Sequence, residues 1–340
     1  MWFTVIILLA FLIRLINLDK AGGLWYDEMS IYSIASQSFP DGMLKTDAHR
    51  FLLFPLYYFV YHFWITIFGN SDFIIRLMSV FFDILSLAAA YFAGKTFSEF
   101  LEKDEKFQKN TGFIYATLYA VNSSFIYYAQ EAKFYSMTFF LVNLVMIFWL
   151  KFLKNQNKKS FFLFYLANFL LIYTYTSQIL LTLLFYALTI VYFVITKCFK
   201  RNIKYLAVLL SAYLPLAAIA CYIKHYFSGN FDAVVYDNSF MLLAIQNYFS
   251  PVLVGVQNNI LEFQKVWFGE ILNIKFWIFV LFPTLLMLLG IFISVKKYKI
   301  GRYLFAIPLI YVIFHITASN FTHYKALVRY TLMILPPLLL

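Results

Sequence analysis

Two adjacent carboxylates, Asp27 and Glu28, follow the first hydrophobic run of the chain. Neighbouring residues lie on different faces of a helix, so a regular helix could not aim both at one ligand. At a junction between a loop and a helix, one acid can act as a general base while the other orients it or binds a metal ion. The competing interpretation is helix capping, because carboxylates favour the first turn of a helix and residues 28–37 look helical.

A second polar stretch, residues 127–136, lies between two hydrophobic runs and reads YYAQEAKFYS. It contributes a third acid, Glu131, and a cation, Lys133. Polar groups beside hydrocarbon are typical of a functional site, although a short solvated turn would have the same pattern. Further candidates near the ends of apolar runs are His49, Arg50, Arg76 and Arg329. Three acids and several cations suit a reaction between an activated hydroxyl and a phosphate-linked donor.

The composition indicates the class of protein that carries these groups. Hydrophobic residues make up 63% of the 340 residues and charged residues 13%, whereas about a quarter of residues are charged in soluble domains. We therefore expect an all-α polytopic membrane protein with a single domain, residues 1–340. The net charge of +11 does not indicate nucleic-acid binding, because the basic residues fall in short loops, where membrane topology explains them.

We expect about ten transmembrane helices, because a span needs roughly 20 predominantly apolar residues. The candidate runs are 2–18, 73–94, 111–128, 134–153, 160–176, 178–196, 204–226, 276–295, 303–318 and 326–340. The shorter run 54–68 is expected to lie in the outer interface as an amphipathic helix. The last run has no polar flank, so the natural chain is expected to continue beyond Leu340.

The distribution of charge sets the expected orientation. Basic clusters alternate along the chain with acid-rich loops, and they occupy residues 95–109, 151–159, 197–204 and 296–302. The positive-inside rule assigns these clusters and the amino terminus to the cytoplasm. Residues 19–72 then form a first outer loop with interfacial helices, and residues 227–275 form a second. If the run 54–68 crossed the membrane instead, Asp27 and Glu28 would lie on the opposite side from Glu131.

Several stretches carry a resemblance to a known family, and they occur in the expected order. They are Asp27-Glu28, Pro55-Leu56-Tyr57-Tyr58, the segment from Phe68-Gly69 to Arg76-Leu77, the stretch Tyr128–Ser136, and Arg329-Tyr330 before Pro336-Pro337. This set resembles the membrane-embedded, polyprenol-dependent glycosyltransferases of family 39, which include protein mannosyltransferases and aminoarabinose-to-lipid A transferases. Residues 150–320 match only as hydrophobic runs. The chain departs from the family at Leu53-Phe54, where His or Lys is usual, and at Lys133, where Arg is usual.

The resemblance implies a GT-C-type fold and an inverting transfer of a sugar from a polyprenyl-phosphate carrier on the extracytoplasmic side. It implies Asp27 as the catalytic base, Glu28 as its orienting or metal-binding neighbour, and Glu131 as an acid that holds a cation or sugar hydroxyls. The substrate-binding set that it implies is Arg76, Glu131, Lys133, Tyr135, His49, Arg50, Tyr57 and Arg329. A divalent cation, Mg²⁺ or Mn²⁺, would be the cofactor that Asp27, Glu28 and Glu131 could hold.

The expected partners are the lipid-linked donor, membrane lipids, and a protein, lipid or glycan that offers a hydroxyl or phosphate as acceptor. The expected location is a bacterial inner membrane. The alternative function is that of a transporter or a flippase for lipid-linked sugars, for which Asp83 is the clearest acid inside an apolar run. Transporters typically show inverted repeats and polar sites at the membrane midplane, and neither feature is evident in the sequence.

Overall fold

The described part of the chain, residues 2–19 and 23–216 of this computed structural model, contains helices and no strand. The expected all-α class is therefore confirmed there. The expected spans 276–295, 303–318 and 326–340, the end of the run 204–226, the outer loop 227–275 and Arg329 lie outside the described residues. The chain divides into two units, of which the first comprises residues 1–121, 128–230 and 340. Both acid-bearing stretches belong to this first unit.

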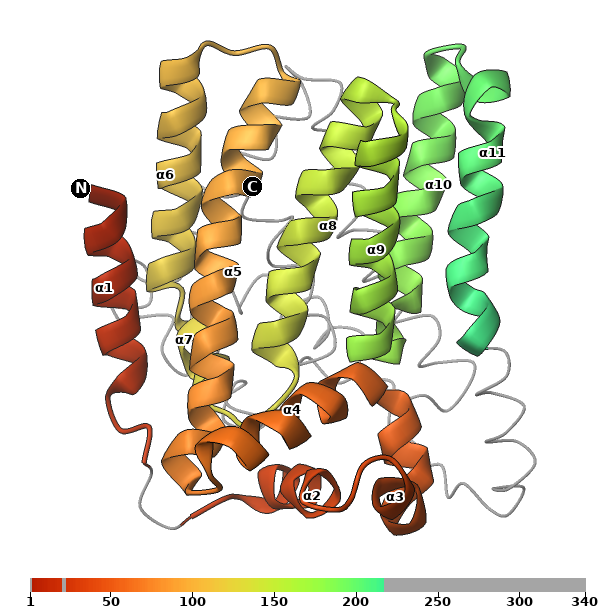
Figure 1. Cartoon of the computed structure of the whole chain (residues 1–340). Helices are drawn as coiled ribbons and strands as arrows, with labels where there is room; N and C mark the ends of the chain where they lie inside the picture. The colour runs from red at the N-terminus through yellow and green to blue at the C-terminus, as the bar shows by residue number, and fades with distance from the viewer. Residues whose placement is uncertain (1, 20–22, 217–340) are drawn as a thin grey trace, which may run out of the picture. The chain divides into compact units, whose positions relative to one another are not determined.

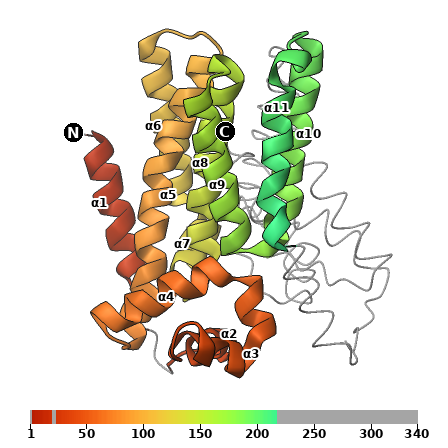
Figure 2. The ribbon, with the colours of Figure 1, turned by 45° about the vertical axis from the view of Figure 1, so that its right-hand side comes forward.

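Three helices that follow the first one lie across one end of the longer helices (Figures 1 and 2). The first four helices are α1 (Trp2–Leu15), α2 (Tyr26–Ala35), α3 (Asp41–Leu53) and α4 (Pro55–Phe68). Pro55 begins α4, at a position where its missing N–H group and fixed φ are favourable. In both views α4 passes beneath the longer helices instead of running beside them.

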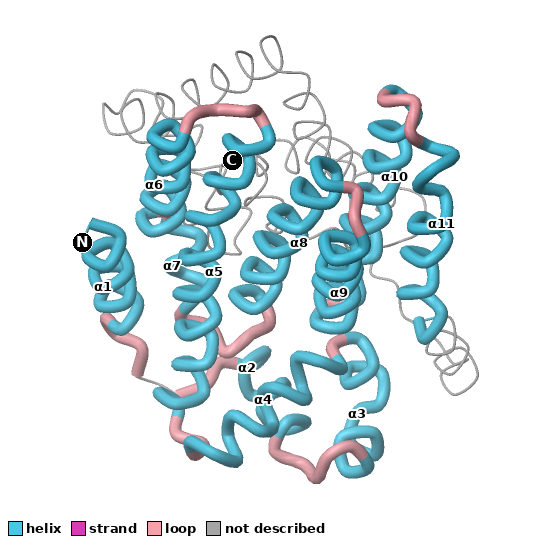
Figure 3. Tube along the Cα trace, turned by 45° about the horizontal axis from the view of Figure 1, so that its top comes forward, coloured by secondary structure: helices cyan, strands magenta, loops and turns pink. Residues whose placement is uncertain are grey.

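The longer helices stand side by side, with short connections at their ends (Figure 3). They are α5 (Asp72–Phe100), α6 (Glu105–Val121), α8 (Tyr135–Asn155), α9 (Lys158–Thr174), α10 (Ile179–Ile195) and α11 (Phe199–Leu210), with the short pieces α7 (Ser123–Ala129), η1 (Thr176–Gln178) and η2 (Ser211–Tyr213). α5 packs against α6, α8 and α1. A Cβ atom at Gly94 would lie 2.9 Å from the carbonyl oxygen of Thr111, so glycine allows α5 and α6 to approach closely.

The basic clusters gather at the end of the first unit that lies opposite α2, α3 and α4. The connections from α5 to α6, from α8 to α9 and from α10 to α11 all lie at that end (Figure 1). These connections and the adjoining turns contain the basic residues of 103–109, 154–159 and 197–201. The alternation of charge along the sequence thus corresponds to two opposite ends of the described helices.

By length and composition, two helices of the described part could cross a membrane, α5 with 29 residues and α8 with 21. They correspond to the expected spans 73–94 and 134–153. The expected span 111–128 is wrong as one helix, because the chain breaks at Asn122 between α6 and α7. Asn122 Oδ1 accepts from the backbone N–H groups of Ser124 and Phe125, and such local bonds compete with the helical pattern.

The other expected spans in this part correspond to helices that are shorter than α5 and α8. α1 has 14 residues, α9 and α10 have 17 each, and α11 has 12. A 17-residue helix extends about 25 Å, whereas the hydrocarbon core of a bilayer is about 30 Å thick. Of these four, α1 and α10 are apolar helices by their overall composition. The total of about ten spans therefore stays a prediction.

Candidate functional site

Glu28 lies in the first turn of α2 and is fully buried. Arg76 of α5 donates to both of its oxygens, from Nε to Oε1 at 3.1 Å and from an η nitrogen to Oε2 at 2.8 Å. The backbone N–H of Ala132 donates to Oε1 at 2.8 Å, and that of Trp25 donates to Oε2 at 3.2 Å. A forked pair between guanidinium and carboxylate fixes orientation as well as charge. Glu28 therefore joins α2, α5 and the loop before α8.

Arg76 is buried too, and all three of its nitrogens donate within the protein. Besides Glu28, it donates to the carbonyl oxygens of Leu18 at 3.2 Å and Gly23 at 2.8 Å. Gly23 has φ of +78°, a conformation that favours glycine. The arginine thus holds the segment that leads from α1 into α2. Its geometry is that of a positioning group, whereas the resemblance implies a substrate-binding residue.

Asp27 points to a different partner from its neighbour. Its Oδ2 lies 2.8 Å from Nζ of Lys133, and its side chain is 31% exposed, whereas the side chain of Lys133 is 4% exposed. The ammonium of Lys133 also lies 3.7 Å from Oε2 of Glu131. It sits over the ring of Trp25 at 4.0 Å and is 5.7 Å from the centroid of Tyr135, and both rings attract a cation.

These contacts assign different tasks to the two adjacent acids. Both oxygens of Glu28 are engaged by four N–H donors, so its carboxylate is a structural anchor that also caps α2. The capping interpretation thus holds for Glu28. Asp27 keeps part of its carboxylate exposed beside a buried ammonium, and a carboxylate placed in this way can accept a proton from a substrate.

The metal interpretation does not fit this geometry. Within the described ranges, no group of three or more His, Cys, Asp or Glu side chains could hold a metal ion. Glu28, one of the three expected ligands, is bonded to Arg76 instead. Lys133 lies between the other two, Asp27 and Glu131, and brings a positive charge to the place that a cation would take.

Tyr57, a further candidate, lies buried on α4 and stacks on Tyr61, with ring centroids 5.6 Å apart. Neither hydroxyl has a hydrogen-bond partner within the described residues. Burial, the neighbouring Tyr61 and Tyr58, and the Glu28 carboxylate raise the pKa of Tyr57 well above its usual value. The Tyr57 hydroxyl therefore stays protonated and can donate a hydrogen bond.

The remaining candidates lie on α3. Arg50 is exposed and pairs with Asp47, with 3.4 Å between Nε and Oδ2. His49 precedes it in the same helix. The structure therefore brings Asp27, Glu28, Arg76, Glu131, Lys133 and Tyr135 together. Tyr57 packs against Phe134, the residue between Lys133 and Tyr135. The structure records no contact of Arg50 with this group.

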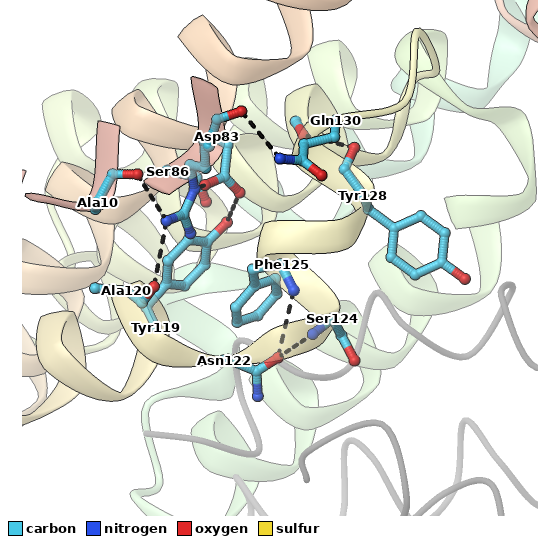
Figure 4. Close-up of polar contacts among 12 residues, drawn as sticks. Ala10, Asp83, Ser86, Tyr119, Ala120, Asn122, Ser124, Phe125, Tyr128 and Gln130 are labelled. Atoms are coloured by element: carbon cyan, nitrogen blue, oxygen red, sulfur yellow. Dashed lines mark hydrogen bonds and ion pairs between the residues drawn. The ribbon is translucent and has the colours of Figure 1, made fainter. Parts of the chain in front are cut away.

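Sequence reasoning did not assign a role to the buried pair of Arg14 and Asp83. Arg14 Nε donates to Asp83 Oδ2, and both side chains are fully buried. Figure 4 shows Tyr119, whose hydroxyl donates to Asp83 Oδ1 at 2.8 Å. The signal was present in the sequence, because opposite charges inside two separate apolar runs tend to pair with one another.

Comparison with known proteins gives no family for this chain. No model of a protein family matches it, and a search among curated proteins finds no match.

Proposed function

We propose that the chain is an inverting glycosyltransferase that moves a sugar from a polyprenyl-phosphate carrier to an acceptor on the extracytoplasmic side of a membrane. One observation carries the proposal: Asp27 lies partly exposed against the buried ammonium of Lys133, where α2 meets the loop before α8. The ordered resemblance of both stretches to polyprenol-dependent glycosyltransferases supports the same reaction. The arrangement of α2, α3 and α4 at one end of the helices suits a site near an interface.

In the proposed reaction, the Asp27 carboxylate takes the proton from the acceptor hydroxyl. The acceptor oxygen then attacks the anomeric carbon from the face opposite the phosphate. The bond between the anomeric carbon and the phosphate oxygen breaks, and polyprenyl phosphate leaves with the bonding electrons. The anomeric configuration is inverted. A positioned base contributes about 10²–10⁴-fold to such a reaction.

Arg76 and Lys133 have different roles in the proposed reaction. Arg76 keeps Glu28 and the segment before α2 in place, since all of its nitrogens donate to protein oxygens. Lys133 balances the charge of Asp27 and Glu131, and its ammonium lies 2.8 Å from the exposed acid. The departing phosphate would contact Lys133 as negative charge develops, an interaction that strengthens in the transition state. The prenyl chain remains in lipid, where each buried CH₂ contributes about 0.8 kcal/mol.

The test is the substitution Asp27→Asn in proteoliposomes that contain a polyprenyl-phosphate sugar and a panel of acceptors. We expect release of polyprenyl phosphate to fall by about a hundredfold or more, the loss of a general base, while the variant inserts and binds donor as wild type does. Asp104→Asn is the matched control, because Asp104 is exposed and lies in the connection before α6, at the opposite end of the helices. Turnover at the wild-type level in Asp27→Asn would refute the assignment.

The same assay addresses the transporter or flippase alternative. Such a protein would move the intact lipid-linked sugar across the bilayer and release no polyprenyl phosphate. The acid that favoured this alternative, Asp83, is bonded to Arg14 and Tyr119, which is the pattern of a structural ion pair.

A further inference from the structure

Gln130 comes directly before Glu131, and its side chain reaches toward the end of α1. Its Nε2 atom donates to the carbonyl oxygen of Ile16 at 2.8 Å and to that of Arg14 at 3.2 Å. Figure 4 shows the Gln130 side chain beside Asp83. The last carbonyl groups of a helix have no partner within the helix. The Gln130 amide thus bonds one carbonyl in the last turn of α1 and one directly after the helix. Both carbonyls lie more than 100 residues before Gln130 in the sequence.

The end of α1 is itself fixed by Arg14. This side chain pairs with Asp83 of α5 and donates to the carbonyl oxygens of Ala10 and Ala120, each at 3.2 Å. Breaking a buried ion pair leaves an uncompensated charge, so the pair holds one arrangement of its helices firmly. The carbonyls that Gln130 bonds are therefore rigidly placed relative to α5 and α6.

Two further hydrogen bonds, at Ala132 and Lys133, fix the rest of the loop from Gln130 to Lys133. The N–H of Ala132 donates to Glu28, and Ser79 of α5 donates to the carbonyl oxygen of Lys133 at 3.3 Å. Ser79 lies three residues after Arg76, so both residues lie on the same face of α5. The two hydrogen bonds from Gln130 tie this loop to the end of α1.

We propose that Gln130 is a positioning residue that sets the place of the Glu131–Lys133 segment, and through it the contact between Lys133 and Asp27. The role requires an N–H donor, because both of its partners are carbonyl oxygens. A glutamate at this position would have the same size but would offer only acceptors to those oxygens. The loop would then move away from α1, and the Lys133 ammonium would lose its buried position.

The first experiment measures the burial of Lys133 and needs no knowledge of the reaction. The full chain in nanodiscs is treated with an amine-specific acylating reagent, and modification at each lysine is followed by peptide mass spectrometry. We expect Lys133 to react about tenfold faster in Gln130→Glu and in Gln130→Met than in the wild type, because both variants lose the hydrogen bonds that hold the loop against α1. Lys154, which is exposed in the last turn of α8, should react at the same rate in all variants.

The matched control is Gln37→Glu. Gln37 is exposed, and its Nε2 donates to the carbonyl oxygen of Ser33 within 3.0 Å, so the substitution removes the same kind of bond away from the loop. Lys133 should stay protected in this control. Unchanged protection of Lys133 in both Gln130→Glu and Gln130→Met would overturn the proposal. Gln130→Met keeps the test valid if the glutamate variant fails to fold.

The second experiment rests on the proposed glycosyl transfer. In the proteoliposome assay, Gln130→Met should lower kcat by about tenfold through the weakened Lys133–Asp27 contact, with the KM for donor within about twofold of the wild-type value. An unchanged kcat with a raised KM would contradict a positioning role. If the wild-type chain transfers no sugar, the proposed function fails, whereas the labelling result still decides the role of Gln130.

Discussion

At the scale of single residues, the main finding is the division of labour between two adjacent acids. Glu28 is closed off by Arg76 and by two backbone N–H groups, whereas Asp27 is partly exposed. The sequence predicted that the two side chains would differ, because neighbours on a helix face different ways. It could not show which one would be exposed, since the partners of Glu28 come from positions 76 and 132.

This division predicts that two conservative substitutions lower the stability of the protein by unequal amounts. Glu28→Gln should lower the free energy of unfolding by about 3 kcal/mol or more, because it leaves the buried Arg76 charge without its partner. Asp27→Asn should lower it by about 1 kcal/mol or less, since one member of that ion pair is partly exposed. Thermal melting in detergent, followed by circular dichroism, measures both. Equal losses of stability would contradict the assignment of Glu28 as the anchor.

At the scale of helices, one buried face of α5 organises the site. Arg76, Ser79 and Asp83 lie on it at spacings of three and four residues, and they bond to Glu28, the Lys133 carbonyl and Arg14 in turn. The two segments that carry the site, residues 27–28 and 127–136, were predictable from the sequence because their charged residues interrupt apolar runs. The break at Asn122 was not, because it depends on a side chain that bonds the backbone two and three residues later.

The buried ion pair between Arg14 of α1 and Asp83 of α5 leads to a prediction about helix packing. Arg14→Met alone should destabilise the protein by about 3–5 kcal/mol, because Asp83 would remain buried without its cation. The double variant Arg14→Met with Asp83→Leu should recover most of that loss, as buried ion pairs can be replaced by well-packed apolar residues. Melting temperatures of the two variants and the wild type measure this. A double variant less stable than the single one would refute the pairing.

At the scale of the first unit, the two ends differ in chemistry. The acids of the site lie at the end with α2, α3 and α4, and the basic connections lie at the other (Figures 1 and 3). The sequence predicted this separation from the alternation of charge alone. The expected lengths differed in both directions, since α1 has 14 residues for the run 2–18 and α5 has 29 for the run 73–94. Hydropathy measures composition, whereas a helix ends where local hydrogen bonds end it.

The expected membrane orientation can be measured directly. In a background with Cys198→Ser and Cys221→Ser, we expect Asp41→Cys to react with a membrane-impermeant maleimide in intact bacterial cells, because Asp41 is exposed at the start of α3. Asp104→Cys, in the connection from α5 to α6, should react only after the membrane is permeabilised. Labelling of both positions from the same side would mean that α5 does not cross the membrane. The reverse pattern would place Asp27 in the cytoplasm, where an extracytoplasmic sugar transfer could not take place.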